Sequence, residues 1–178
     1  MTAVATQLVG SVLFTDLVGF TEFNDVSGDA AAVRVLDHQR RLIDGVLERH
    51  PGSRLVKELG DGLMIWSPDA PGAISSASEF LAAVDTERDA GSFPLAVRLG
   101  IHHGSVTERG HDVVGQTVNI AARISALAGP SELLVSDEVL AACGGSQLRG
   151  VEPVGPVSVK GVATPVWLHR IELVTATP

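Results

Sequence analysis

The apolar positions along the chain follow two different periods, and each period predicts one type of secondary structure. Short β-branched or alternating apolar runs predict strands, whereas apolar residues three and four positions apart predict helices. A polar connection is expected at residues 103–114. Strands are predicted at residues 9–15, 95–102, 133–135, 156–160 and 165–173, a β-hairpin at 54–67, and helices at about 29–48, 71–88, 115–127 and 137–142.

The hairpin decides the predicted fold class. Two apolar runs meet at the turn Gly60-Asp61-Gly62, and strands joined by so short a turn are antiparallel. This favours an α+β, ferredoxin-like mixed sheet with helices packed on one face over a purely parallel doubly wound fold. The glycines form neither a dinucleotide-binding fingerprint nor a phosphate loop with its lysine.

The first strand of this hairpin carries a lysine in apolar surroundings. In a regular strand Leu55, Lys57 and Leu59 share one side. Lys57 and Lys160 are the only lysines among 13 basic residues, the rest being arginines. Lysine is a compact single-point donor, so its presence at these two places favours tight sites. The alternative is an amphipathic lysine that lies along an apolar surface.

Length and composition are those of one soluble domain. The chain has 178 residues, 45% of them hydrophobic, and a single cysteine, which excludes an internal disulfide. No signal peptide is evident, and no apolar run approaches the roughly 18–20 residues of a membrane span. We therefore expect a cytoplasmic protein with its domain at residues 8–173, between flexible tails at 1–7 and 174–178.

The charge limits the class of ligand. A net charge of −8 argues against a broad nucleic-acid-binding surface. An anionic substrate would have to be held locally, by metal ions and a few cations. Asp16, where the first strand ends, and Asp61, in the hairpin turn, are candidate ligands for Mg²⁺, although aspartates are also common in turns for conformational reasons. The helix start at Gly19-Phe20-Thr21 would offer backbone N–H groups to phosphates.

The predicted helix at 115–127 carries two polar residues on one face. Asn119 and Arg123 are spaced i, i+4, among the apolar neighbours Val118, Ala121 and Ile124. We expect this helix to be largely buried, so that its two polar members require partners. The alternative is an ordinary solvated stripe.

Three segments carry a resemblance to a known family. The segments FTDLVGFT (14–21), KELGDG (57–62) and DVVGQTVNIAAR (112–123) resemble the catalytic motifs of class III adenylyl cyclases, in the order and spacing of that family. The resemblance runs from about residue 9 to 173. Each motif alone is weak, but the three together are specific.

The resemblance implies a role for each matching residue. It implies two divalent metal ions, Mg²⁺ or Mn²⁺, bound by Asp16, Asp61 and the backbone carbonyl of Leu17. The roles implied for the substrate-binding side are adenine recognition by Lys57 and Asp112, ribose positioning by Asn119, charge stabilisation at the α-phosphate by Arg123, terminal phosphate contact by Lys160, and further phosphate contact at Phe20 and Thr21.

The implied substrate is ATP, and the implied assembly is a homodimer with two composite active sites. Lys57 would donate to N1 of adenine and Asp112 would accept from its 6-amino group, which leaves guanine mispaired at both atoms. Asp16 and Asp61 would enter each site from one chain and the other residues from its partner. The connection at 104–112 is short compared with the dimerisation arm of many members, and no regulatory domain is expected.

Three rival functions remain. A catalytically silent, cyclase-like module that binds nucleotide and regulates a partner is the main alternative. It would be expected to lack a metal aspartate or the arginine, and this chain has them all. A guanylyl cyclase is disfavoured by Lys57 and Asp112. A diguanylate cyclase would need a different hairpin signature.

Overall fold

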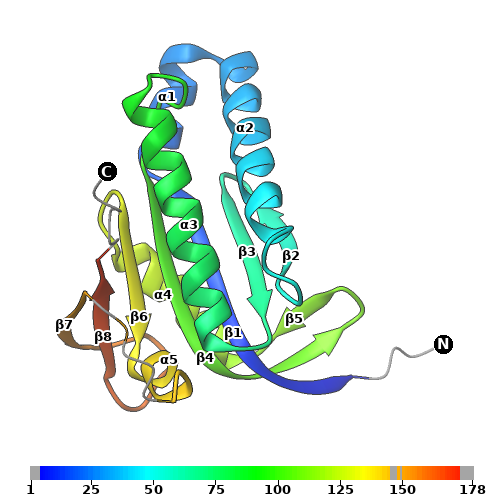
Figure 1. The fold of residues 1–178 in the computed structure, drawn as a ribbon, viewed down its shortest axis with the longest axis vertical. Coiled ribbons are helices and arrows are strands. Elements are labelled where there is room, and N and C mark those ends of the chain that lie inside the picture. Colours follow the sequence, from blue (N-terminus) through cyan, green and yellow to red (C-terminus); the bar gives the residue numbers. More distant parts are fainter. Residues whose placement is uncertain (1–4, 145–147, 149, 173–178) are drawn as a thin grey trace.

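The computed structural model describes residues 5–144, 148 and 150–172, which form one mixed sheet and five helices (Figure 1). The predicted tail at 174–178 lies outside the described residues, as do the first four residues of the predicted tail at 1–7. The elements are β1 (Thr6–Leu17), α1 (Phe20–Ser27), α2 (Asp29–Leu47), β2 (Arg54–Leu59), β3 (Gly62–Ser67), α3 (Ala70–Asp89), β4 (Val97–Arg109), β5 (Asp112–Val114), α4 (Gln116–Leu127), β6 (Glu132–Ser136), α5 (Asp137–Ala142), β7 (Val151–Val157) and β8 (Val166–Ile171).

The sheet confirms the predicted α+β class. Its strand order is β2-β3-β1-β4-β6-β8-β7, with β5 paired to β4. Only β4 and β6 run parallel among the pairs that the structure describes, and the other pairs are antiparallel. The central strands β1 and β4 pair along twelve positions, from Thr6 opposite Glu108 to Leu17 opposite Val97.

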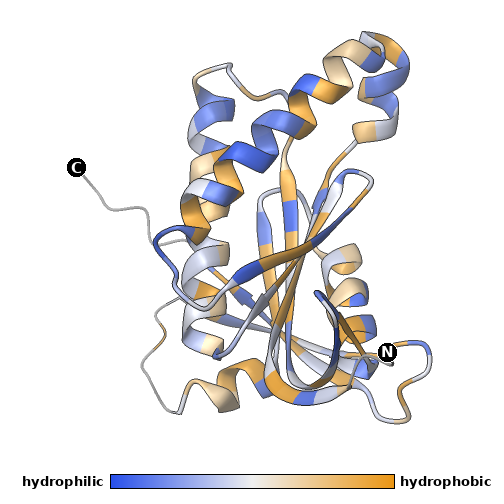
Figure 2. Ribbon diagram, turned by 90° about the vertical axis from the view of Figure 1, so that its right-hand side faces the viewer, coloured by the Kyte–Doolittle hydropathy of each residue, from blue (hydrophilic) through white to orange (hydrophobic). Residues whose placement is uncertain are grey.

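Helices cover both faces of the sheet, so the expectation of helices on one face is wrong. On one face, α2, α3 and α5 bury residues such as Ile43, Phe80 and Val139 against Leu13 and Ile65 of the sheet. The opposite face is covered by α4. Figure 2 shows helices on both sides of the strands. The sheet residues on the α4 face, which alternate in sequence with those of the first face, are Val12, Phe14, Met64 and Val106.

Two glycines of β4 let α4 lie directly on the sheet. A Cβ at Gly100 would lie 2.1 Å from the backbone nitrogen of Ser125, and one at Gly104 would lie 2.7 Å from Oγ1 of Thr117. Such distances leave no room for a side chain. The axis of α4 is therefore fixed close to β4, and with it the face of α4 that carries Asn119 and Arg123.

A β-bulge in β2 changes the predicted direction of Lys57. Leu55 lies opposite Ile65, but Lys57 lies opposite Met64, because the register shifts by one residue between them. Ile65 belongs to the core beneath α2 and α3, whereas Met64 faces α4. Leu55 and Lys57 therefore do not share a side, since a bulge re-aims the side chains that follow it. Lys57 is directed to the α4 face.

The predicted polar connection at 103–114 is also wrong. Strand β4 continues to Arg109, turns at Gly110 (φ 65°) and returns as β5, with Arg109 opposite Asp112. The strand was missed because polar residues and glycine fill its outer half, where Val106 is the one buried apolar residue. The segment thus forms a hairpin arm, which projects from the sheet in Figure 1.

The remaining boundaries agree with expectation to within a few residues, except at the C-terminal edge. Strand β7 occupies Val151–Val157 rather than 156–160, and its ladder is interrupted between Pro153 and Gly155. Two prolines fit there because β7 pairs with β8 alone among the described strands and forms an edge of the sheet. None of the described helices is long and apolar enough to cross a membrane.

Candidate active site

Asp16 lies at the end of β1 and is held by an arginine of the neighbouring strand. Arg98 of β4 stands directly opposite Asp16 in the ladder. Its Nε donates to Oδ2 of Asp16 at 2.6 Å, and its Nη2 lies 2.5 Å from the same oxygen. Both side chains are about 30% exposed. A hollow of about 190 Å³ opens beside this pair and reaches Ala126 of α4.

Asp61 lies next to Asp16 because the β2–β3 turn packs against the end of β1. A Cβ at Gly62 would lie 2.8 Å from the carbonyl oxygen of Thr15, so glycine allows this close approach. A residue of α2 also holds the turn. Buried Gln39 of α2 donates its side-chain N–H to the carbonyl of Asp61 at 3.2 Å.

The pKa of Asp61 is raised above its ordinary value. Burial is the largest cause, the negative charge of Asp16 is the next, and the backbone N–H groups of Asp61 and Leu17 act in the opposite direction. Two carboxylates this close destabilise each other's ionised form. A cation between them would remove that cost.

These two carboxylates fit a divalent cation of the Mg²⁺ type, which prefers oxygen ligands and is often bound through one or two carboxylates together with substrate phosphates. The described residues contain no group of three or more histidine, cysteine, aspartate or glutamate side chains arranged for a metal ion. The remaining ligands would therefore have to be water, backbone carbonyls or the substrate. The Leu17 carbonyl remains a prediction, although Leu17 closes β1 beside Asp61.

Lys57 and Asp112 form an ion pair across two distant parts of the sequence. Nζ of Lys57 donates to Oδ2 of Asp112 at 2.7 Å, and the other oxygen of Asp112 accepts from the N–H of Val113 at 2.9 Å. The bulge in β2 and the β4–β5 hairpin bring them together. Both side chains are about 40% exposed, so a ligand can reach them.

A second contact fixes the hairpin arm that carries Asp112. Arg54 donates to the carbonyl of His111 at 2.8 Å and to the carboxylate of Glu108 at 2.9 Å. Its guanidinium also lies over the ring of Trp66, 5.6 Å from the centroid. These contacts tie β2 to the arm next to Asp112.

Asn119 and Arg123 point outward from α4, so the prediction of a largely buried helix is wrong. Both are exposed, and the buried residues of this helix lie on its other face: Thr117, Ile120, Ala121, Ile124 and Ser125. Neither side chain makes a hydrogen bond or ion pair within the part of the chain that the structure describes. Two interpretations fit this geometry. Asn119 and Arg123 are either part of an ordinary solvated stripe, or they act toward a second chain.

Arg123 and Lys160 line the same hollow. It has a volume of about 220 Å³ and is bounded by the end of α4 and by the segment that follows β7. Buried Val159 anchors that segment, so exposed Lys160 projects beside Arg123. Ala126 borders both this hollow and the one beside Asp16. The structure thus brings two predicted phosphate-binding cations together.

Phe20 and Thr21 occupy the first turn of α1, as expected. The helix follows Gly19, which has a left-handed backbone (φ 78°) and provides no side-chain cap. Thr21 is exposed, whereas Phe20 packs against the main core. Phosphate contact at these two residues remains a prediction, and the side chain of Phe20 has a structural role in any case.

Arg98 is the charged residue of this site that the sequence analysis missed. It interrupts the apolar run Val97-Arg98-Leu99, as Lys57 interrupts the β2 run. That signal was present, but only the β1–β4 register reveals that Arg98 faces Asp16. Its Nη1 also lies 3.4 Å from the carbonyl of Ala126, so it bridges the carboxylates and α4.

Comparison with known proteins gives a consistent result. The model of the adenylate and guanylate cyclase catalytic domain matches residues 4–172. The pH-sensitive adenylate cyclase MT1302 of Mycobacterium tuberculosis is 30% identical over 166 residues, which cover 90% of this chain and 40% of that protein. Guanylate cyclase 2G of Mus musculus is 31% identical over 180 residues, which cover 89% of this chain and 16% of that protein.

Solved structures agree on the fold. The adenylate/guanylate cyclase/hydrolase of Silicibacter pomeroyi superposes with a TM-score of 0.82 at 24% identity, covering 94% of this chain and 98% of that one. The chain spans less than half the length of the curated relatives described above. Relatives with adenylate and with guanylate in their names both match, so the choice of base has to be argued from this chain's own residues.

Proposed function

Because the chain belongs to the adenylate and guanylate cyclase catalytic domain family, we propose that it converts ATP to 3′,5′-cyclic AMP and pyrophosphate. The ribose 3′-hydroxyl would attack the α-phosphate at a site shared across a homodimer. The alternative is a catalytically silent nucleotide-binding module of the same fold. The cyclase reaction is favoured because the chain retains both aspartates, Asn119 and Arg123.

The ion pair between Lys57 and Asp112 carries the choice of ATP. It presents one donor and one acceptor 2.7 Å apart, both partly exposed. Adenine offers an acceptor at N1 and a donor at its amino group, which complements this pair. Guanine offers a donor and an acceptor in the reverse order. A site that reads hydrogen bonds in this way discriminates strongly, since the wrong base leaves polar groups unpaired.

Asp16 and Asp61 would hold divalent cations, Mg²⁺ or Mn²⁺, which would supply positive charge at the attacking oxygen and at the phosphates. The proximity of the two carboxylates and the raised pKa of Asp61 support this assignment. In the chain without ligands, Arg98 forms an ion pair with Asp16. On cation binding it would be released toward Ala126 and the substrate phosphates.

The remaining residues orient the substrate and neutralise its charge. Asn119 would hydrogen-bond the ribose, Arg123 would stabilise the charge that develops on the α-phosphate, and Lys160 would bind the terminal phosphates. The hollow shared by Arg123 and Lys160 supports their joint role. The first turn of α1, at Phe20 and Thr21, would add backbone N–H groups.

We further propose that two chains build each site. Asn119 and Arg123 make no polar contact within the described residues and face away from their own sheet. A two-fold dimer would place them opposite the carboxylates of the partner. The segment expected to be a short connection forms the projecting β4–β5 hairpin arm. This arm would offer contact surface to a second chain. An ATP-dependent cyclase of this kind would act in the cytoplasm, where ATP is available.

The test is a cyclase assay of the purified chain with ATP or GTP, in the presence of Mn²⁺ and then of Mg²⁺. We expect cyclic AMP from ATP and at least roughly tenfold less cyclic GMP from GTP. Equal or greater use of GTP would contradict the base assignment. Nucleotide binding without product from either substrate would establish the silent alternative instead.

A further inference from the structure

A cavity on the α2 side of the molecule is lined by none of the residues assigned above. It has a volume of about 390 Å³ and is lined by α1, α2 and the segment that joins α3 to β4. This is within the size range of small-molecule sites. The proposed active-site residues on the sheet face α4, whereas α2 covers the opposite face, so the cavity is a separate feature.

Two guanidinium groups at this cavity are free of carboxylates. Six of the ten arginines that the structure describes form ion pairs, but Arg34 and Arg41 form none within the described residues. They lie seven positions apart on α2, on either side of His38, and thus follow one helix face. In a chain of net charge −8, two cations without ion pairs at one cavity would attract an anion locally.

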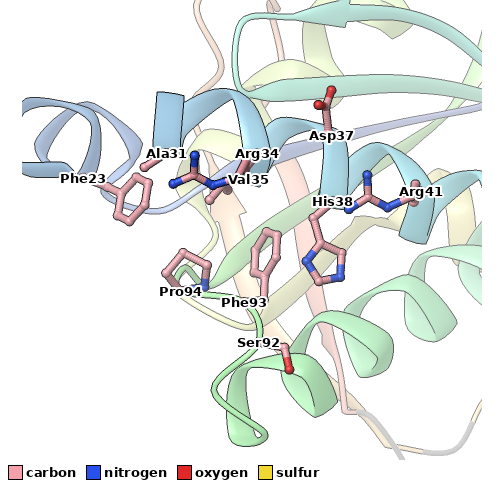
Figure 3. A pocket seen from close by; sticks show the side chains of 10 residues that line it. All are labelled: Phe23, Ala31, Arg34, Val35, Asp37, His38, Arg41, Ser92, Phe93 and Pro94. Carbon is pink, nitrogen blue, oxygen red and sulfur yellow. The ribbon is translucent and has the colours of Figure 1, made fainter. Parts of the chain in front are cut away.

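The acidic groups nearby do not neutralise these arginines. Asp37 borders the cavity, but it forms no ion pair with Arg34 or Arg41 within the described residues, and Figure 3 shows its carboxylate on the side of α2 away from Phe93. Glu87 of α3 lies 3.7 Å from Nε2 of His38 and forms no ion pair with either arginine within the described residues. The guanidiniums therefore remain available to an anion from solution.

The floor of the cavity is aromatic and apolar. Phe23, Phe93 and Pro94 project toward one another from α1 and from the α3–β4 segment (Figure 3). The rings of His38 and Phe93 meet edge to face, with centroids 5.4 Å apart and planes at 81°. This aromatic surface suits a flat apolar group better than a hydrated inorganic ion.

We propose that this cavity binds a small anion carried on a flat or aromatic body, of which an aryl phosphate is the simplest example. The phosphate would be held by Arg34 and Arg41, because guanidinium groups form paired hydrogen bonds with phosphate and carboxylate. The ring would lie against Phe23, Phe93 and Pro94. The proposal does not depend on cyclase activity.

The test is titration of the metal-free and nucleotide-free protein with phenyl phosphate, followed by calorimetry and by NMR of the backbone amides. We expect a Kd on the order of 1 mM or below, with shifts centred on residues 31–41 and 92–93. The double variant Arg34→Gln/Arg41→Gln should weaken binding by at least roughly tenfold. Both arginines are exposed, so the variant should fold, which thermal unfolding checks.

Two matched variants separate this site from general charge effects. Arg109→Gln removes another arginine without an ion pair in the described residues, and Arg123→Gln removes the proposed catalytic arginine. Both should leave the affinity within about twofold. Equal weakening in either control, or unchanged affinity in the double variant, would overturn the proposal.

The ligand class is tested with three further probes. Inorganic phosphate and phenol should each bind at least roughly tenfold more weakly than phenyl phosphate, since each lacks one half of the recognition. Equal affinity for inorganic phosphate would contradict a role for the aromatic surface. Displacement of phenyl phosphate by a tighter-binding glutamate-rich peptide would identify a protein-docking site, which also overturns the small-molecule assignment.

Discussion

The proposed active site contains two charged pairs that differ in how well the free chain satisfies them. Asp16 and Asp61 are like charges at one end of β1, where burial and mutual repulsion raise the pKa of Asp61. Lys57 and Asp112 are opposite charges that already form a hydrogen-bonded ion pair at 2.7 Å. In the first pair only Asp16 has a positively charged neighbour, Arg98, whereas the two charges of the second pair neutralise each other.

This difference indicates how each pair should respond to its ligand. A cation relieves the repulsion at Asp61 and competes with Arg98 for Asp16, so metal binding should change local stability. Adenine has to insert its N1 and amino group where Lys57 and Asp112 now meet. The base-reading pair should therefore determine selectivity more than stability, since exposed ion pairs contribute little to folding.

The largest effect should come from removing either carboxylate of the first pair. Asp16→Ala and Asp61→Ala should each lower cyclic AMP formation at saturating Mn²⁺ by roughly 100-fold or more, because charge stabilisation in the transition state is lost. Asp25→Ala, at an exposed position of α1, serves as the matched control and should keep full activity. Activity within a few-fold of the parent chain would remove that aspartate from the site.

An exchange of the second pair should have a smaller effect on rate and a larger one on selectivity. In Lys57→Glu/Asp112→Ser, glutamate accepts from guanine N1–H and serine donates to its O6. The kcat/KM for ATP should fall roughly 10- to 100-fold relative to that for GTP. Steady-state kinetics with both nucleotides measure this, and dimer formation and thermal unfolding should change little. A preserved ATP preference would mean that these residues do not read the base.

The smallest effect is a change in Tm in the absence of metal, which should differ in sign between variants of Asp61 and Asp16. Because the folded-state pKa of Asp61 is raised above its ordinary value of 3.8, its ionised form destabilises the fold at neutral pH. Asp61→Asn should therefore raise Tm by about 1–2 °C near pH 7, and the gain should disappear as pH falls through the raised pKa toward 3.8.

Asp16→Asn is the matched comparison for that measurement. It removes the negative charge that pairs with Arg98 and should lower Tm instead, by a similar amount. Unfolding curves with a chelator present, at about pH 7.5 and pH 4.5, distinguish the two variants. If both variants shifted Tm in the same direction, the two carboxylates would not differ as described.

Much of the fold was predictable because its signals are local. The turn Gly60-Asp61-Gly62 and the apolar periods of α2, α3 and α4 place their elements to within a few residues. The outer half of β4 was missed because Val106 is its one large apolar side chain, so that half shows no apolar alternation. The position of α4 on the opposite face depends on contacts with Gly100 and Gly104, which periodicity does not report.

The residue types of the site were predictable, but the directions in which their side chains point were not. The bulge between Leu55 and Lys57 reverses the expected side of the lysine, and only the strand register reveals it. Arg98 required the register of β1 against β4. The outward direction of Asn119 and Arg123 was missed since apolar neighbours suggested a buried helix. Their action toward a second chain remains a prediction.

The central claim, that each site combines carboxylates of one chain with the arginine of another, is tested most directly by mixing two inactive variants. Asp16→Ala and Arg123→Ala chains would form mixed dimers in which one site carries both lesions and the other carries none. With random exchange at equal amounts, activity should recover to roughly a quarter of the parent level. If one chain supplied the whole site, samples shown by mass spectrometry to contain mixed dimers would stay inactive, and that result would contradict the account.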